Sequence, residues 1–128
     1  MTITLYHHPY SRASTVVWML EELGLEYELR FVDILNGAQK QPDILALNPM
    51  GKLPILVDGG VVVTEVAAIG LYLADRYSAG KLAPKFDDPR RGRAVCACFY
   101  RRERSARRAG RRRRRNAHHG DRDRHGDA

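Results

Sequence analysis

The chain has 128 residues, of which 44% are hydrophobic and 29% charged, and its formal net charge is +7. The charge is unevenly spread, since residues 1–92 carry 9 Lys and Arg against 11 Asp and Glu, whereas residues 93–128 carry 13 Arg against 4 acids. Only the first segment can bury a core, and its length suits one small domain. The chain has neither a membrane-length apolar run nor a signal-like leader, so we expect a soluble cytoplasmic protein.

Residues 2–33 predict a strand, a helix and a second strand. Residues 2–6 are β-prone and end at His7-His8-Pro9. Apolar residues then recur at helical spacing, with Gly24 as a stop; they are Ala13, Val16, Val17, Leu20 and Leu23. Residues 26–33 alternate between polar and apolar, as a half-buried strand does. A crossover helix between the two strands would make them parallel.

The next segment predicts a short helix, a loop and a hairpin. After a polar connection, residues 41–47 have a short helical pattern, and Asn48-Pro49 with Gly51 marks a loop. Leu53-Pro54 then opens an apolar strand that turns back at Gly59-Gly60. Because Pro54 lacks an N–H, we expect this strand at a sheet edge or with a special peptide geometry. Either arrangement leaves the Leu53 main chain free for a ligand.

A last helix is predicted from Glu65 to the Ser78–Gly80 stop. Its apolar face consists of Val66, Ile69, Gly70, Leu73 and Tyr77. The complete order is β-α-β-α-β-β-α, which is that of a thioredoxin-like α/β domain. In such a domain a parallel strand pair is extended by an antiparallel hairpin, and helices cover both faces of the sheet.

Five stretches of the chain form one pattern, namely Leu5–Ala13, Trp18–Leu25, Asn48–Gly59, Thr64–Ile69 and Tyr72–Ala74. Together they resemble the N-terminal domain of a glutathione S-transferase of the bacterial or fungal type. The resemblance covers residues 1 to about 90 and implies a thioredoxin-like domain over 1–80, a linker over 81–92 and a homodimer. It also implies that glutathione is the co-substrate, conjugated through its thiolate to a small electrophile. In the resembled family Pro54 is cis, and Leu53 pairs its main chain with the cysteine part of glutathione.

Ser11, at the start of the first predicted helix, is the expected thiol-activating residue. A thiol with an ordinary pKa near 8.5 needs donors and positive potential to ionise, and a helix N-terminus supplies both. The Ser11 hydroxyl has two interpretations of about equal weight, a donor to the thiolate or an N-cap of the helix. Sister groups of the family bring in rivals at His8 and Tyr6, and Tyr10 of the same motif is a third. The two cysteines of a glutaredoxin are absent here, so dithiol exchange is not expected.

The loop and the hairpin are expected to hold the two ends of glutathione. Lys52 is placed to meet a carboxylate, and Glu65 with the Val66 amide, at a helix N-terminus, is placed for the γ-glutamyl end. The family usually has a serine after this glutamate, so Val66 removes a hydroxyl contact and leaves the amide. The alternatives are a solvated lysine and an acid that balances the helix dipole, but the combined spacing favours binding. The expected binding set is Ser11, Lys52, Leu53, Pro54, Glu65 and Val66.

Residues 93–128 form a basic low-complexity segment that we expect to be disordered. It includes Arg111–Arg115 and stands where the resemblance implies an all-helical second domain. A reading-frame slip near residues 90–93 is our preferred hypothesis, and a functional basic tail that contacts phosphates is the alternative. Without the second domain we expect weak glutathione binding, little conjugation, an unsettled oligomeric state, and exposed apolar surface around Trp18 and the last helix.

Two other functions stay open from the sequence. A non-catalytic thioredoxin-like module would bind glutathione without turning it over. A nucleic-acid-binding protein would act through the arginine-rich tail, although the folded segment gives this idea no support, so nucleic acid is not an expected partner. No metal is expected either, because the spacing of Cys96 and Cys98 from the downstream histidines fits no zinc pattern; those histidines are His118, His119 and His125.

Overall fold

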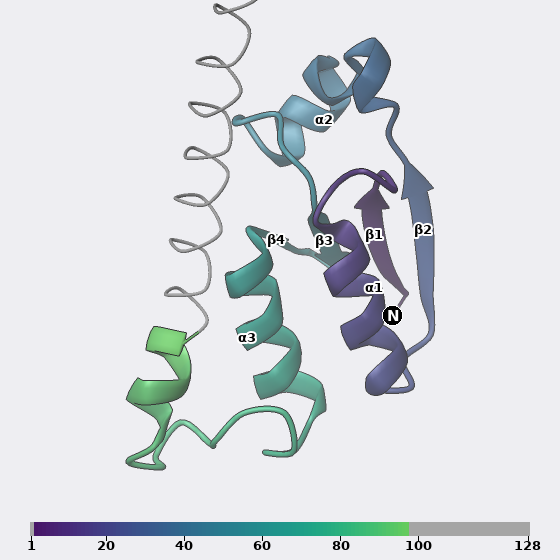
Figure 1. Ribbon diagram of the computed structural model, residues 1–128. Helices are drawn as coiled ribbons and strands as arrows, with labels where there is room; N and C mark the ends of the chain where they lie inside the picture. The colour runs from purple at the N-terminus through teal and green to yellow at the C-terminus, as the bar shows by residue number, and fades with distance from the viewer. Residues whose placement is uncertain (1, 98–128) are drawn as a thin grey trace, which may run out of the picture. The chain divides into compact units, whose positions relative to one another are not determined.

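Figure 1 shows the computed structural model, which describes residues 2–97. The elements in chain order are β1 (Ile3–His7), α1 (Ala13–Glu22), β2 (Tyr27–Phe31), the 3-10 helices η1 (Ile34–Asn36) and η2 (Ala38–Lys40), α2 (Pro42–Leu47), β3 (Ile55–Asp58), β4 (Val61–Thr64) and α3 (Val66–Tyr77). Apart from η1 and η2, this is the predicted order. The prediction of a thioredoxin-like α/β domain is therefore confirmed.

The four strands form one mixed sheet in the order β2-β1-β3-β4, with a hydrophobic cluster on each face. β1 pairs in parallel with β2, and the pairs β1–β3 and β3–β4 are antiparallel. Successive side chains of a strand point to opposite faces. Leu5 and Leu56 therefore join the cluster of α1 and α3, while Ile55 joins Ile44 of α2 on the other face. The predicted helix faces are the buried ones, with Val16 and Leu20 in α1 and Ile69 and Leu73 in α3.

β2 is parallel to β1 as predicted, but the expectation that it is half-buried was wrong. Tyr27 is partly buried, whereas the next four residues are exposed, with Leu29 at 46% and Phe31 at 60%. The cause is the position of β2 at the sheet edge, where a strand has a neighbour on one side only. Trp18 on α1 is also 60% exposed, as expected. The large hydrophobic side chains of α3, in contrast, are all at least partly buried.

Three connections meet at one end of the sheet. β3 is antiparallel to both β1 and β4, so the carboxyl ends of β1 and β4 lie at the end of the sheet where β3 begins. Three features lie at this end of the sheet: the β1–α1 loop, the Leu53-Pro54 peptide before β3, and Glu65 before α3. α1 and α3 run side by side in the same direction, and both begin there (Figure 1). The fold thus brings the N-termini of two helices to the residues that the sequence analysis selected.

A buried carboxylate ties the hairpin to α3. Asp58 ends β3 with a fully buried side chain, and its Oδ2 accepts hydrogen bonds from the hydroxyls of Tyr77 at 2.6 Å and Tyr72 at 2.7 Å. Nε of Arg76 lies 3.2 Å from the same oxygen. Burial alone would raise the pKa of Asp58, but the two tyrosines and the Arg76 charge outweigh it and lower that pKa. The ionised carboxylate therefore anchors the hairpin to the helix.

The segment after α3 packs back onto that helix. Arg91 donates to the two carboxylate oxygens of Asp75 at 2.6 and 2.7 Å, and to the Pro84 carbonyl at 2.8 Å. The chain divides into two units, residues 1–91 and 92–128, and all the elements named above belong to the first. Residues 91–97 are helical, so the expectation of disorder was wrong for residues 93–97. The rest of the segment predicted to be disordered, from residue 98 on, lies outside the described residues.

Candidate functional site

Asn48 organises the loop that leads into β3. Its buried side chain bridges the loop, because Nδ2 donates to the Lys52 carbonyl at 2.8 Å and Oδ1 accepts from the Met50 N–H at 3.1 Å. The Leu53-Pro54 peptide is cis, as in the resembled family. Pairing with β1 begins only at Ile55, so the sheet does not use the Leu53 main chain. That main chain is available to an extended ligand.

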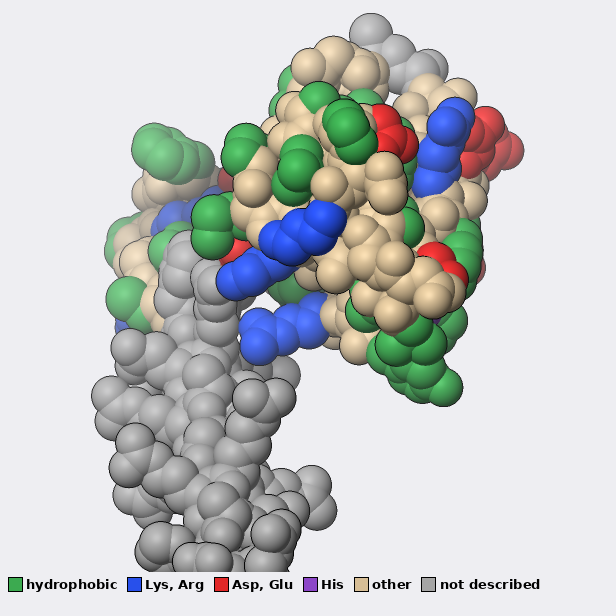
Figure 2. All heavy atoms as spheres, turned by 90° about the horizontal axis from the view of Figure 1, so that it is seen from above, with side chains coloured by type: hydrophobic (Ala, Val, Ile, Leu, Met, Phe, Trp, Pro, Cys, Tyr) green, Lys and Arg blue, Asp and Glu red, His purple; other side chains and the backbone are tan. Residues whose placement is uncertain are grey.

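Two lysines border this loop, and the sequence analysis found only one of them. Lys52 is exposed on the loop, and Lys40 at the end of η2 donates from Nζ to the Met50 carbonyl at 3.1 Å. Gly51 has a φ of +57°, and a Cβ there would come within 2.9 Å of the backbone oxygen of Gln39, so glycine is required. Figure 2 looks down on this end of the domain and shows Lys and Arg side chains among hydrophobic ones. The edge can therefore attract a carboxylate.

Ser11 stands at the start of α1 with its hydroxyl already engaged by the backbone. Its Oγ donates to the His8 carbonyl at 2.7 Å and accepts from the Ala13 N–H at 3.2 Å. The second bond is that of a capping serine, although the formal N-cap position belongs to Arg12. Ser11 is partly exposed at the positive end of α1. The arrangement fits both interpretations, a cap and a donor that can turn from the carbonyl to an arriving anion.

The three rivals of Ser11 lie in different surroundings. His8 is 4% exposed, and its Nδ1 accepts a hydrogen bond from the Tyr10 N–H at 3.1 Å. Tyr10 itself is 80% exposed, and Tyr6 packs partly buried against the cluster beneath α2. Within residues 2–97, Ser11 alone of the four has a side-chain atom bonded to an amide of the first turn of α1. Ser11 is therefore the strongest of the four candidates.

Glu65 and Val66 join β4 to α3 through an uncommon backbone conformation. Glu65 has φ 70° and ψ 125°, a region that side-chain-bearing residues rarely adopt and that is concentrated at binding sites. Its side chain is exposed at the start of α3. Val66 packs partly buried against the cluster between α1 and α3, and its amide is one of the first of the helix. A ligand end that carries both an ammonium and a carboxylate fits this pair.

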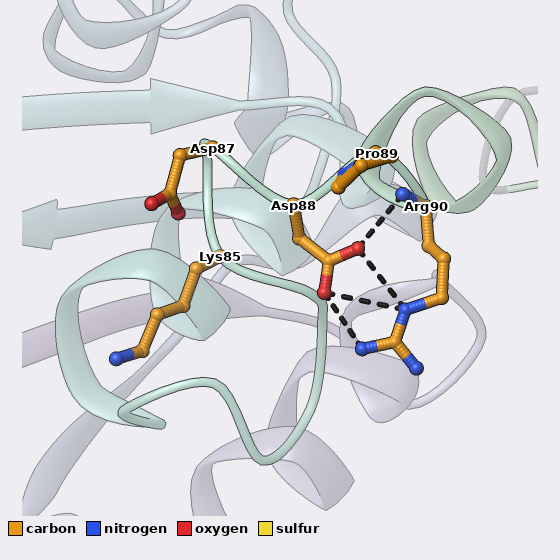
Figure 3. Close-up of a pocket in the computed structure, with 5 residues that line it drawn as sticks. All are labelled: Lys85, Asp87, Asp88, Pro89 and Arg90. Atoms are coloured by element: carbon orange, nitrogen blue, oxygen red, sulfur yellow. Dashed lines mark hydrogen bonds and ion pairs between the residues drawn. The ribbon is translucent and has the colours of Figure 1, made fainter.

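A surface hollow lies away from these residues, in the segment after α3 (Figure 3). It is lined by Lys85, Asp87, Asp88, Pro89 and Arg90. The Arg90 guanidinium closes on the Asp88 carboxylate, with Nε 3.0 Å from Oδ1 and a terminal nitrogen 2.6 Å from Oδ2. This hydrogen bonding lowers the pKa of Asp88 to about 2. The arginine charge is thus neutralised locally, and no predicted site residue lines the hollow.

The described part of the chain offers no metal site, since no three of its His, Cys, Asp and Glu side chains are grouped to hold an ion. Cys96 is an exposed free thiol, and Cys98 and the downstream histidines lie outside the described residues. Over the same residues, 2–97, no helix has the length and apolar character to cross a membrane.

Sequence comparison extends the likeness seen in the geometry. The family model described as "Glutathione S-transferase, N-terminal domain" matches residues 1–75. Glutathione S-transferase 3 of Zea mays is 46% identical over 78 residues, which cover 60% of this chain and 35% of that protein. The chain thus spans about a third of the length of this curated relative.

Solved structures give the same result. A glutathione transferase homolog from Lodderomyces elongisporus, crystallised with two glutathione molecules per subunit, superposes with a TM-score of 0.73 at 29% identity, over 78% of this chain and 50% of that one. Glutathione transferase URE2P8 of Phanerochaete chrysosporium, crystallised with oxidized glutathione, gives a TM-score of 0.62 at 36% identity, over 67% and 42%. The chain therefore belongs to the glutathione S-transferase family, which it joins through the N-terminal domain.

Proposed function

We propose that this chain binds glutathione along the Asn48–Glu65 loop and hairpin and activates its thiol for transfer to an electrophile. Leu53 pairs its main chain with the cysteine part of the ligand, at the bend set by Pro54. Lys52 meets one carboxylate, and Glu65 with the Val66 amide holds the γ-glutamyl end. Crystals of two relatives contain glutathione or its oxidized form, which supports the same ligand for this chain.

The observation that carries the proposal is that three features meet at one end of the sheet. The N-terminus of α1, the unpaired Leu53 main chain and the positive-φ Glu65 lie together because β1 and β4 end where β3 begins. Glutathione is an extended tripeptide-like molecule with a central thiol and a charged group at each end. A free strand edge flanked by amides and cations suits each of these parts.

The proposed chemistry needs one donor at the thiol. The Ser11 hydroxyl turns from the His8 carbonyl to the glutathione sulfur, and the thiol proton leaves to solvent. Each unit by which the thiol pKa falls corresponds to about 1.4 kcal/mol of preferential stabilisation of the thiolate. The thiolate then attacks the electrophilic carbon, so that a C–S bond forms while the electron pair of the broken bond stays with the leaving group.

Titration of the full chain with glutathione, combined with the ultraviolet absorbance of the bound thiolate against pH, tests this function. Ser11→Ala should raise the pKa of the bound thiol by roughly one to two units, the value of a hydrogen bond to a charged group. Ser14→Ala is the matched control, because Ser14 is exposed and, among residues 2–97, its hydroxyl donates only to the Ser11 carbonyl, at 3.5 Å. Absence of glutathione binding would sink the proposal, and an unchanged thiol pKa in Ser11→Ala would return the role to His8, Tyr6 or Tyr10.

A non-catalytic glutathione-binding module is the second candidate. It is favoured by the present engagement of Ser11, whose hydroxyl is already bonded to the His8 carbonyl and the Ala13 amide. Binding of glutathione without turnover of a generic electrophile would select it. The identity of the electrophile, a homodimer and a cytoplasmic location belong to the proposal as expectations from the family.

A further inference from the structure

The imidazole of His8 is buried beside the turn that carries Ser11. Its ring packs against those of Phe31 and Tyr10, with centroid distances of 5.2 and 5.4 Å. Nδ1 accepts a hydrogen bond from the Tyr10 N–H at 3.1 Å. An accepting ring nitrogen carries no proton, so the neutral ring holds its proton on Nε2. The tautomer of His8 is thus set by the backbone of the turn.

His8 also contacts Ser11 through its main chain. The His8 carbonyl accepts from the Ser11 N–H at 2.9 Å and from the Ser11 hydroxyl at 2.7 Å. The bond from Nδ1 to the amide two residues on has the same pattern as an Asx turn, in which an asparagine Oδ1 takes the place of Nδ1. Ring and carbonyl together fix residues 9–11. They leave Ser11 Oγ at the first turn of α1, where it meets the Ala13 amide.

We infer that His8 is a positioning residue for Ser11, because its Nδ1 holds the Tyr10 amide and thereby keeps the Ser11 hydroxyl at the N-terminus of α1. The hydrogen-bond acceptor, rather than the aromatic ring or a charge, is the property that matters. The purpose of this positioning rests on the proposed function, in which the hydroxyl serves the glutathione thiolate. His8 itself need not touch the ligand.

Two variants separate the acceptor from the ring. His8→Asn keeps an acceptor near the position of Nδ1 and loses the ring, whereas His8→Phe keeps a ring against Phe31 and Tyr10 and loses the acceptor. Backbone-amide NMR of the full chain reports on the turn without any ligand. We expect the Tyr10 amide of His8→Phe to exchange with solvent about tenfold faster than in the wild type, the effect of one lost hydrogen bond. In His8→Asn it should stay close to the wild-type rate.

The pKa of the bound glutathione thiol gives a second readout, in which a role in packing alone predicts a different ranking of the two variants. His8→Phe should raise that pKa as Ser11→Ala does, whereas His8→Asn should leave it at the wild-type value. If the ring only packs, the thiol pKa should rise in His8→Asn and stay unchanged in His8→Phe. That result would overturn the inference. Equal effects of the two variants would overturn it as well. Exchange of the buried Leu20 amide serves as the reference for any general loss of stability.

Failure of this inference can be told apart from failure of the proposed function. If the wild type binds no glutathione, the function is wrong, and the Tyr10 amide comparison still decides the role of His8. If glutathione binds normally and the Tyr10 amide is unchanged in His8→Phe, the function stands and the positioning role is wrong.

Discussion

Replacing Asp58 with asparagine should destabilise the domain at neutral pH. The buried carboxylate accepts from Tyr77 and Tyr72 at 2.6 and 2.7 Å. A hydrogen bond to a charged group contributes about 1.5–3 kcal/mol, and asparagine keeps an acceptor but loses the charge, so we expect a loss of about 2 kcal/mol in the free energy of unfolding. Arg76 adds little to this figure, since its side chain is 50% exposed and screened by water. Small domains have only about 5–15 kcal/mol of stability in total, so the loss is substantial.

The stabilisation that Asp58 contributes should decrease as the pH falls. Burial opposes the shift, yet the hydrogen bonds from Tyr77 and Tyr72 and the Arg76 charge lower the pKa of Asp58 in the folded protein. The unfolded chain binds this proton near pH 3.9, so the stabilisation is fully present above that pH and is lost as the pH falls through the lower folded value. The asparagine variant does not titrate at this position. The difference between the two proteins should therefore be constant near neutrality and shrink below about pH 4.

Urea unfolding followed by circular dichroism, at neutral and acid pH, measures the effect. Asp43→Asn is the control, because Asp43 is an exposed carboxylate in the first turn of α2, and its replacement should change stability by less than about 0.5 kcal/mol. Equal stability of Asp58→Asn and the wild type at neutral pH would refute the reasoning. A difference that persists undiminished in acid would refute the assigned pKa direction.

Two further predictions concern the ligand. Lys52→Ala should weaken glutathione binding about threefold at low salt, because an exposed ion pair contributes less than about 1 kcal/mol, and calorimetry should find the difference reduced at high salt. An unchanged Kd at low salt would exclude Lys52 as an anchor. Val66→Ser should tighten binding roughly tenfold by adding a hydroxyl for the γ-glutamyl carboxylate. Val66→Ala loses the same packing without gaining the hydroxyl, so equal affinities of these two variants would contradict the assignment.

The order of elements was predictable because its signals are local. Val16 and Leu20 recur at helical spacing, and their burial needs only that the helix has a covered face. Leu29 and Phe31 alternate as in a half-buried strand, but their burial depends on which neighbours the sheet gives β2. A position at the sheet edge is a property of the whole fold, and the alternation of residues does not encode it.

The candidate site divides in the same way. Ser11 and Glu65 were predicted as site residues because they precede helices and match a family pattern. Lys40 escaped notice because its importance comes from a contact ten residues away, the bond from Nζ to the Met50 carbonyl. Asn48 was read only as a loop marker, whereas its side chain holds the loop together. Such contacts follow from tertiary packing and cannot be predicted from the spacing of residues in the sequence.

In the proposed function, glutathione affinity and turnover of an electrophile would depend on different surfaces of this domain. Every proposed glutathione contact comes from residues 11–66, which belong to one folded unit. The aromatic side chains beside the Ser11 turn, Tyr10 and Phe31, are 80% and 60% exposed, so the described residues leave them largely uncovered. An apolar electrophile gains binding energy in proportion to the area it removes from water, and an open surface offers little of it. Glutathione affinity therefore tests the proposed anchors alone, while under the proposed transfer the KM for an electrophile would report on any cover over Tyr10 and Phe31.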